Sequence, residues 1–213
     1  MICGEEMMGM NNKNIIFLGS SVTYGDAGWS MCEYVKETIG CNVIKWAVSG
    51  TTLSNLSEQS YVSRLDRQIV NQDKCDCFIC QLSTNDAKDI FVLGEIADSK
   101  NADDFETTTI IGAIEYILSR VKEKWSCPIL FYTGTYMENT KYQQMVYSLI
   151  ELSKKWHFEI IDLWNNPRMR AIDAEKYSEY MNDPVHPNKL GYKEWWGPEF
   201  VNAIIKVLNN NVD

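Results

Sequence analysis

An aspartate and a histidine three residues apart, Asp183 and His186, are the residues of this sequence best suited to acid–base chemistry. A neutral imidazole accepts a proton from a hydroxyl only when its other ring nitrogen is held in the right tautomer, and a nearby carboxylate does this. Pro184 disfavours a helical conformation at Asp183, so we expect the carboxylate to be free to turn back toward His186. The spacing predicts a general base and the group that orients it.

A nucleophile for this pair is available near the start of the chain. Ser21 lies in a Gly-Ser-Ser-Val-Thr segment at residues 19–23, directly after an apolar run, where a strand is expected to turn into a helix. A serine early in the chain, with Asp and His near its end, is typical of hydrolases that form a covalent serine intermediate. Each segment alone also has a simpler interpretation, because Asp-Pro is a common turn and residues 19–23 could be a plain connection.

Two further polar segments follow apolar runs in the same way. Gly50 lies in Val-Ser-Gly-Thr-Thr at residues 48–52, and Asn85 lies in Leu-Ser-Thr-Asn-Asp at residues 82–86. In a parallel α/β sheet the carboxyl ends of the strands meet at one edge, where ligands bind. We therefore expect these two segments to lie beside Ser21.

In this order the four segments resemble the motifs of the SGNH (GDSL-type) hydrolases, which are Gly-Asp-Ser, Gly, Gly-x-Asn-Asp and Asp-x-x-His. The resemblance extends from residue 15 to about residue 200, nearly the whole chain. It implies a lipase/acylhydrolase or carbohydrate esterase that needs neither a metal nor an organic cofactor. It also implies a flavodoxin-like fold with a parallel sheet between two layers of helices.

The resemblance assigns roles residue by residue. Ser21 would be the nucleophile, His186 the general base and then acid, and Asp183 the residue that orients the imidazole. The N–H groups of Ser21 and Gly50 and the side-chain amide of Asn85 would form the oxyanion hole.

The sequence departs from the family motifs at three places. Ser20 replaces the usual aspartate of Gly-Asp-Ser, and we expect its hydroxyl to cap the following turn. Ser83 replaces the glycine of Gly-x-Asn-Asp, which adds a side chain where glycine permits positive φ or a close backbone approach. Trp46 lies where Asn-x-Gly often precedes the second motif, so we expect it to reshape the wall beside Gly50.

Strands and helices are predicted to alternate, which favours a five-stranded parallel sheet in a three-layer α/β/α sandwich. The predicted strands are residues 15–18, 43–47, 77–82, 129–133 and 159–163. The predicted helices are residues 29–39, 62–70, 105–125, 142–156 and 190–208, the last broken at Gly197-Pro198. We expect a single domain over residues 1–213, with residues 1–13 a disordered extension and residues 88–104 bordering the mouth of the active site.

Composition excludes several classes of partner. A net charge of −9 argues against binding nucleic acid or an anionic membrane surface, and no apolar stretch approaches the roughly 20 residues that span a bilayer. Seven cysteines leave at least one thiol unpaired, and the first residues lack a signal-peptide pattern, so we expect a cytoplasmic protein. Cys75, Cys77 and Cys80 lie close together in sequence, but strand alternation should separate the last two, which favours core thiols over a zinc site.

For substrate we expect a short-chain acyl ester, with acetyl favoured and a carbohydrate as a candidate alcohol part, because aromatic residues are plentiful and no long apolar groove or membrane-binding helix is indicated.

 The substrate-binding residues predicted for it are aromatic: Tyr24, Trp46 and Trp195. Arg168 and Arg170 follow the fifth strand, where they could meet an anionic group of the substrate or lie in a solvated loop.

Three other interpretations stay open. A long-chain substrate would make the protein a lysophospholipase-like or thioesterase-like acylhydrolase. A Ser/Thr-rich first loop also suits a flavodoxin-like protein that binds a flavin phosphate, although that leaves Asn85, Asp183 and His186 without a role. A carbohydrate-binding protein without catalytic activity is the third. The second histidine, His157, lies where a helix is expected to end and is assigned a structural role there.

Overall fold

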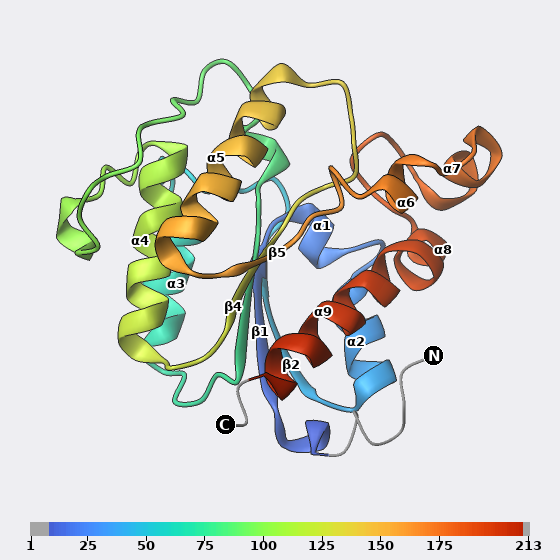
Figure 1. The fold of residues 1–213 in the computed structure, drawn as a ribbon, viewed down its shortest axis with the longest axis horizontal. Helices are drawn as coiled ribbons and strands as arrows, with labels where there is room; N and C mark the ends of the chain where they lie inside the picture. The colour runs from blue at the N-terminus through green and yellow to red at the C-terminus, as the bar shows by residue number, and fades with distance from the viewer. Residues whose placement is uncertain (1–8, 211–213) are drawn as a thin grey trace.

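The computed structural model describes residues 9–210 and has at its centre a sheet of five strands, all parallel, in the order β2-β1-β3-β4-β5 (Figure 1). The strands are β1 (Asn14–Gly19), β2 (Asn42–Ala47), β3 (Cys77–Gln81), β4 (Ile129–Tyr132) and β5 (Glu159–Ile161). Helices cover both faces of this sheet, so the predicted three-layer α/β/α sandwich is confirmed.

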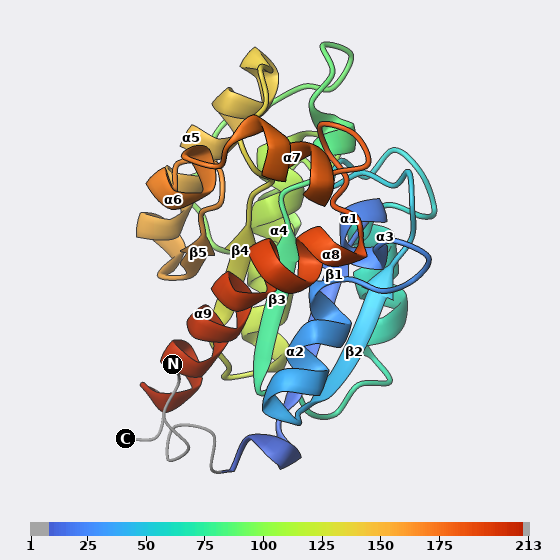
Figure 2. The ribbon, with the colours of Figure 1, turned by 90° about the vertical axis from the view of Figure 1, so that its right-hand side faces the viewer.

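Each face of the sheet has its own hydrophobic core. The longer helices are α2 (Met31–Ile39), α3 (Tyr61–Ile69), α4 (Ile110–Lys124), α5 (Thr140–Trp156) and α9 (Gly197–Asn209). Buried side chains of α3, α4 and α5 pack on one face, and those of α2 and α9 pack on the other (Figures 1 and 2). Successive residues of a strand point to opposite faces, and β3 accordingly places Cys77 in the second core and Cys80 in the first, as predicted.

Short elements gather at the carboxyl ends of the strands. They are α1 (Ser21–Tyr24), a 3₁₀ turn at Thr84–Asp86, α6 (Pro167–Arg170), α7 (Ala174–Tyr180) and α8 (Lys189–Gly191). A helix was expected at the position of α1, and α8 overlaps the start of the helix predicted over residues 190–208, but α6, α7 and the 3₁₀ turn were not predicted, because each is too short to show a hydrophobic period. Side-chain caps define two of them instead, since Asn166 accepts a hydrogen bond from the Arg168 N–H and Asp173 accepts one from the Lys176 N–H.

The start of the described chain is more ordered than the sequence predicted. Residues 10–12 form a 3₁₀ turn, and the Met10 side chain is 3 % exposed in the core beneath α2 and α9. The prediction of a disordered extension over residues 1–13 is therefore wrong for residues 9–13, while residues 1–8 lie outside the described part of the chain.

The last helical region continues through the predicted break. A π-helical turn, Tyr192–Trp196, joins α8 to α9, and Gly197 keeps helical backbone angles. Pro198, which has no N–H to donate, lies just after the π-helical turn, whose wider spacing accommodates it. The sequence therefore located the irregularity correctly, but the chain widens its helical turn there and does not stop.

Residues 88–104 do not border the mouth of the candidate site. They pack against α4 and α5, as the green loop beside these helices in Figure 1 shows. Lys155 of α5 donates to the carbonyls of Ala97 and Ser99, and the Ala97 N–H donates to the Glu115 carboxylate of α4. A 3₁₀ turn at Ala102–Asp104 closes the segment.

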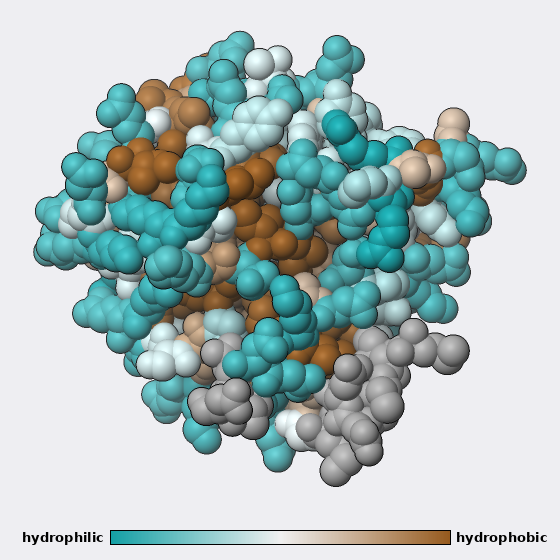
Figure 3. Space-filling model, viewed as in Figure 1, coloured by the Kyte–Doolittle hydropathy of each residue, from teal (hydrophilic) through white to brown (hydrophobic). Residues whose placement is uncertain are grey.

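Hydrophilic side chains cover most of the surface seen in Figure 3. Apolar residues show mainly in the hollow over β5, between α5 and α9. Within residues 9–210, no helix combines the length and the apolar character needed to cross a membrane.

One buried ion pair fastens residues 88–104 to the helices. The fully buried Glu115 carboxylate pairs with Lys155 and also accepts hydrogen bonds from Trp156 Nε1 and the Ala97 N–H. We expect Glu115→Ala to lower the free energy of unfolding by about 3 kcal/mol, because it leaves a buried cation and two donors without their acceptor. Urea denaturation followed by circular dichroism measures this change.

The matched control is Glu123→Ala on the same helix. The Glu123 side chain is exposed and pairs with Arg120 across one turn of α4, so its loss should cost less than about 1 kcal/mol. Equal losses in the two variants would contradict a fastening role for Glu115.

Candidate active site

Ser21, His186 and Asp183 form a continuous chain of hydrogen bonds. Ser21 Oγ lies 2.7 Å from His186 Nε2, and His186 Nδ1 lies 2.8 Å from Asp183 Oδ2. A carboxylate only accepts hydrogen bonds, so the proton of the neutral imidazole belongs on Nδ1. Nε2 is then the acceptor for the Ser21 hydroxyl, which is the arrangement needed to remove the serine proton.

The Asp183–His186 turn is closed by its own aspartate. Asp183 Oδ1 accepts the backbone N–H groups of Val185 at 2.8 Å and of His186 at 2.9 Å. Burial acts to raise the pKa of Asp183, but the hydrogen bonds from Val185 and His186 outweigh it and lower the pKa. The carboxylate therefore stays ionised beside the imidazole, and an Asn182 N–H bond to the His186 carbonyl closes the turn further.

Ser21 is the first residue of α1, immediately beyond β1, and the turn before it is fixed by Gln81 at the end of β3. Gln81 Oε1 accepts from the Ser20 N–H at 2.8 Å and from the hydroxyls of Ser20 and Thr23. The prediction that the Ser20 hydroxyl caps the turn is wrong, because this hydroxyl makes no capping bond to α1. Sequence analysis missed Gln81, which looks like any other residue of a buried strand.

Asn85 and Gly50 are brought together through Thr51. The Asn85 side-chain amide donates one hydrogen bond to the Thr51 carbonyl at 2.9 Å. An amide NH₂ has two hydrogens, so the second remains available to another acceptor. Gly50 has φ of +78°, a conformation that side chains other than glycine rarely adopt.

Ser83 fits its position without strain. Its φ is −67° and its ψ is 125°, so this residue has the extended backbone that any amino acid can adopt. Its buried hydroxyl accepts the Asn85 N–H at 3.2 Å and caps the 3₁₀ turn at Thr84–Asp86. The replacement of the family glycine by Ser83 thus adds a bond that holds Asn85.

A buried carboxylate fixes the loop after β2 against this 3₁₀ turn. Asp86 accepts hydrogen bonds from the backbone N–H groups of Leu53 and Ser54 and from the Ser54 hydroxyl, at 2.7–3.0 Å. The loop that carries Gly50 is therefore tied directly to the turn that carries Asn85.

A second buried charge joins this loop to β1. The Arg64 guanidinium of α3 donates to the carbonyls of Gly19 at 2.8 Å and Trp46 at 2.6 Å, and to Thr51 Oγ1 at 3.1 Å. Burial lowers the pKa of Arg64. Its planar fork of N–H groups spans the ends of β1 and β2 and the loop after β2, a reach that no other side chain offers.

A cavity of about 240 Å³ opens beside the Ser21 hydroxyl. The residues that line it come from the loop after α1, the loop after β2, the Asp183–His186 turn and the last helical region: Ser21, Gly25, Asp26, Ala27, Ser49, Asn182, Asp183, His186, Pro187 and Tyr192. Most of these side chains are small or polar.

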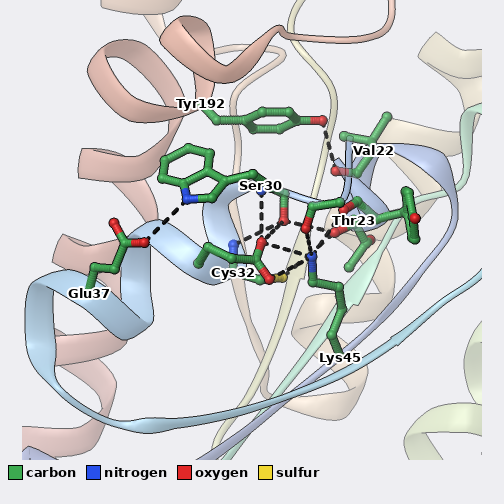
Figure 4. A network of polar contacts seen from close by, with 11 residues as sticks. Val22, Thr23, Ser30, Cys32, Glu37, Lys45 and Tyr192 are labelled. Atoms are coloured by element: carbon green, nitrogen blue, oxygen red, sulfur yellow. Dashed lines mark hydrogen bonds and ion pairs between the residues drawn. The ribbon is translucent and has the colours of Figure 1, made fainter. Parts of the chain in front are cut away.

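Lys45 holds the wall of this cavity formed by residues 25–28 (Figure 4). Its ammonium group donates to the carbonyls of Tyr24 and Gly28 and pairs with Glu33 at 2.8 Å. Glu33 in turn accepts the Ser30 N–H at the start of α2. The wall contains Ala27 at φ of +48°, a strained conformation that these bonds stabilise.

The predicted substrate-binding aromatics lie in three different places. Tyr24 is 46 % exposed beside residues 25–28, and its ring lies under the Lys45 ammonium. Trp46 is 7 % exposed in the core with α3 and α4, so it does not form the predicted wall beside Gly50. Trp195 lines a second pocket, described below, together with Arg170.

Neither His157 nor any of the six cysteines in the described part of the chain lines this cavity. In the described part of the chain, no group of three or more His, Cys, Asp or Glu side chains is arranged to hold a metal ion. Cys75 Sγ lies 3.7 Å from Cys127 Sγ, a partner that sequence spacing did not indicate. His157 ends α5 in the left-handed conformation, at φ of +54°.

Comparison with known proteins agrees with this geometry. Residues 17–194 match the GDSL-like lipase/acylhydrolase family. The chain belongs to this family. No curated protein matches the chain.

Solved structures of other GDSL-like lipases/acylhydrolases and related proteins share its fold. A protein from Lactobacillus plantarum has 16 % sequence identity and a TM-score of 0.73, over 95 % of this chain and 99 % of that one. A candidate GDSL-like lipase from Bacteroides ovatus has 16 % identity and a TM-score of 0.64, over 92 % of this chain and 99 % of that one. A gut microbial diltiazem-metabolizing enzyme has 18 % identity and a TM-score of 0.62, over 92 % of this chain and 47 % of that one.

Arg64 offers a test of how this family member holds its site together. We expect Arg64→Lys to lower the free energy of unfolding by about 2 kcal/mol, because one ammonium group cannot reach all the acceptors of the guanidinium, so buried charge-assisted hydrogen bonds are lost. Any esterase kcat should fall by about 10-fold or more, since the segments carrying Ser21 and Gly50 lose their common anchor.

Arg67→Lys is the matched control on the same helix. Arg67 makes an exposed hydrogen bond to the Glu58 carbonyl, so this change should leave both stability and turnover nearly as they are. A similar result for the two lysine variants would contradict the anchoring role.

Proposed function

We propose that the protein is a serine esterase that cleaves short-chain acyl esters through an acyl-enzyme on Ser21. The observation that carries this proposal is the chain of hydrogen bonds from the Ser21 hydroxyl through His186 to Asp183, in a member of an acylhydrolase family. A flavin-binding protein would have no use for this chain, because a phosphate-binding loop needs donors and no base.

In the first half of the reaction, Ser21 Oγ attacks the ester carbonyl while His186 Nε2 takes the hydroxyl proton. Asp183 stabilises the imidazolium that forms. His186 then returns this proton to the departing alkoxide as the carbon–oxygen bond of the ester breaks. The products of this half are the free alcohol and an acyl ester of Ser21.

In the second half, water replaces the alcohol. His186 takes a proton from the water, whose oxygen attacks the acyl carbon, and then gives the proton to Ser21 Oγ as the acid leaves. In both halves we assign the oxyanion to the Ser21 and Gly50 N–H groups and to the second amide hydrogen of Asn85. All of these steps use the chain's own residues and water.

The cavity beside Ser21 favours a small acyl group. Its volume of about 240 Å³ and its small, polar lining leave little apolar surface for a long chain. Trp46 and residues 88–104, which were expected to border the site, do not line this cavity. Lysophospholipids and long-chain thioesters are disfavoured for the same reason, and an acylated carbohydrate remains compatible with a short acyl group.

Covalent labelling tests the nucleophile. A fluorophosphonate should react with the wild-type protein at Ser21, because His186 removes the hydroxyl proton as fluoride leaves phosphorus. We expect Ser21→Ala to abolish labelling and to reduce kcat by at least about 10⁴-fold. Ser20→Ala is the control at the neighbouring residue and should keep most of the labelling and most of the kcat. Mass spectrometry that finds the label on Ser20 of the wild-type protein would refute the assignment.

A series of 4-nitrophenyl esters tests the acyl group. We expect kcat/KM for acetyl and propionyl esters to exceed that for octanoyl by about 10-fold or more, because the longer chain does not fit the small, mostly polar cavity that Ser21 lines. Released nitrophenol measures the rate. A kcat/KM that rises with chain length would instead indicate a lipid or thioester substrate.

A further inference from the structure

A second, larger pocket lies at the same carboxyl edge of the sheet. Its volume is about 630 Å³, in the range of pockets that hold drug-sized molecules. The loop after β4, the short helices α6 and α7 and the π-helical turn Tyr192–Trp196 enclose it. The side chains that matter here are Tyr136, Met169, Arg170, Ile172, Tyr177 and Trp195.

The only cation of this lining is Arg170, and its charge is available. The Arg170 guanidinium lies 4.0 Å from the centre of the exposed Tyr136 ring. Within residues 9–210 it forms no ion pair, whereas Arg168, two residues earlier, pairs with Glu199 at 3.0 Å. A guanidinium stacked on a ring keeps its N–H edge free, and this edge matches a carboxylate with two parallel hydrogen bonds.

Apart from Arg170 and Thr135, the lining is aromatic or aliphatic. Trp195 packs against Tyr177 and Tyr180, with ring centres 6.1 and 6.0 Å apart, so its indole is held in place. Met169 and Ile172 add apolar side chains. Flat rings and aliphatic groups are suited to a planar ligand, because they can pack against its faces.

The second pocket lies close to the Ser21 site on two sides. Tyr177 belongs to α7, whose end leads within three residues to Asp183, and the pKa of Tyr177 is raised by burial and then by the Asp183 charge. On the other side, Gly134 directly precedes Thr135 of the lining, and a Cβ added at Gly134 would lie 3.9 Å from the methyl group of Thr84, the residue before Asn85. Figure 2 shows α7 at the same end of the sheet as α1.

We propose that this pocket binds the alcohol part of the ester, and that this part is an aromatic or similarly planar group with a carboxylate held by Arg170. The proposal rests on the esterase function of Ser21 proposed above. The net charge of −9 gives an anion no long-range attraction, so its recognition depends on this one local cation.

Binding without turnover tests the pocket by itself. The probes are 4-hydroxybenzoate and 4-hydroxycinnamate, two lengths of phenolic acid, each compared with its neutral amide. Calorimetric titration of Ser21→Ala should show at least one acid binding about 10-fold more tightly than its amide, as expected for one charge-assisted pair. In the Ser21→Ala background, Arg170→Gln should remove the preference for the acid over its amide. Arg168→Gln in the same background should leave this preference unchanged.

Kinetics separates this proposal from the esterase proposal. The substrates are the O-acetyl esters of the same acids and amides. The wild-type protein should show a higher kcat/KM for the ester of the acid than for the ester of its amide, and Arg170→Gln should bring the ratio of these two values close to 1. Tighter binding of the acid than of its amide, without hydrolysis of any ester, would refute the proposed esterase function and support the proposed role of the second pocket. Hydrolysis with equal rates for acid and amide, or equal effects of Arg170→Gln and Arg168→Gln, would refute the pocket.

Discussion

A single buried guanidinium determines how the segments around Ser21 meet. Arg64 projects from α3 beneath the carboxyl ends of β1 and β2 and binds the carbonyls of Gly19 and Trp46 and the hydroxyl of Thr51. A carbonyl oxygen has two lone pairs, so the Gly19 carbonyl accepts Arg64 in addition to the Val48 N–H of the neighbouring strand end. Arg64 binds these carbonyls from below, so the upper side of the same loops is left to face a ligand.

The order in which polar segments follow the strands made much of this site predictable. Ser21, Gly50 and Asn85 come after three apolar runs, and a parallel sheet brings the ends of such runs to one edge. The pairing of His186 with Ser21 was expected from the order of the motifs and from Asp183, which is placed to orient His186. By contrast, Arg64 looked like an ordinary charged residue of an amphipathic helix, because burial depends on which face the helix presents to the sheet.

Side chains whose role depends on direction were less predictable. Trp46 lies two residues from the loop that carries Ser49 and Gly50, but strand alternation points its indole into the core. Residues 88–104 were misplaced because their partners, Glu115 and Lys155, belong to helices distant in sequence. The pocket containing Arg170 and Trp195 was invisible for a related reason: α6 and α7 have no hydrophobic period to predict them.

The contact between Ser21 and His186 joins residues 165 positions apart. β1 lies in the interior of the sheet, between β2 and β3, and is synthesised first, whereas the turn that contains His186 follows the last strand. In the proposed mechanism, a growing chain therefore carries its serine for most of its synthesis without the base that removes its proton. Because the two residues can meet only after the last part of the domain is made, the proposed acylation of Ser21 becomes possible only at the end of folding.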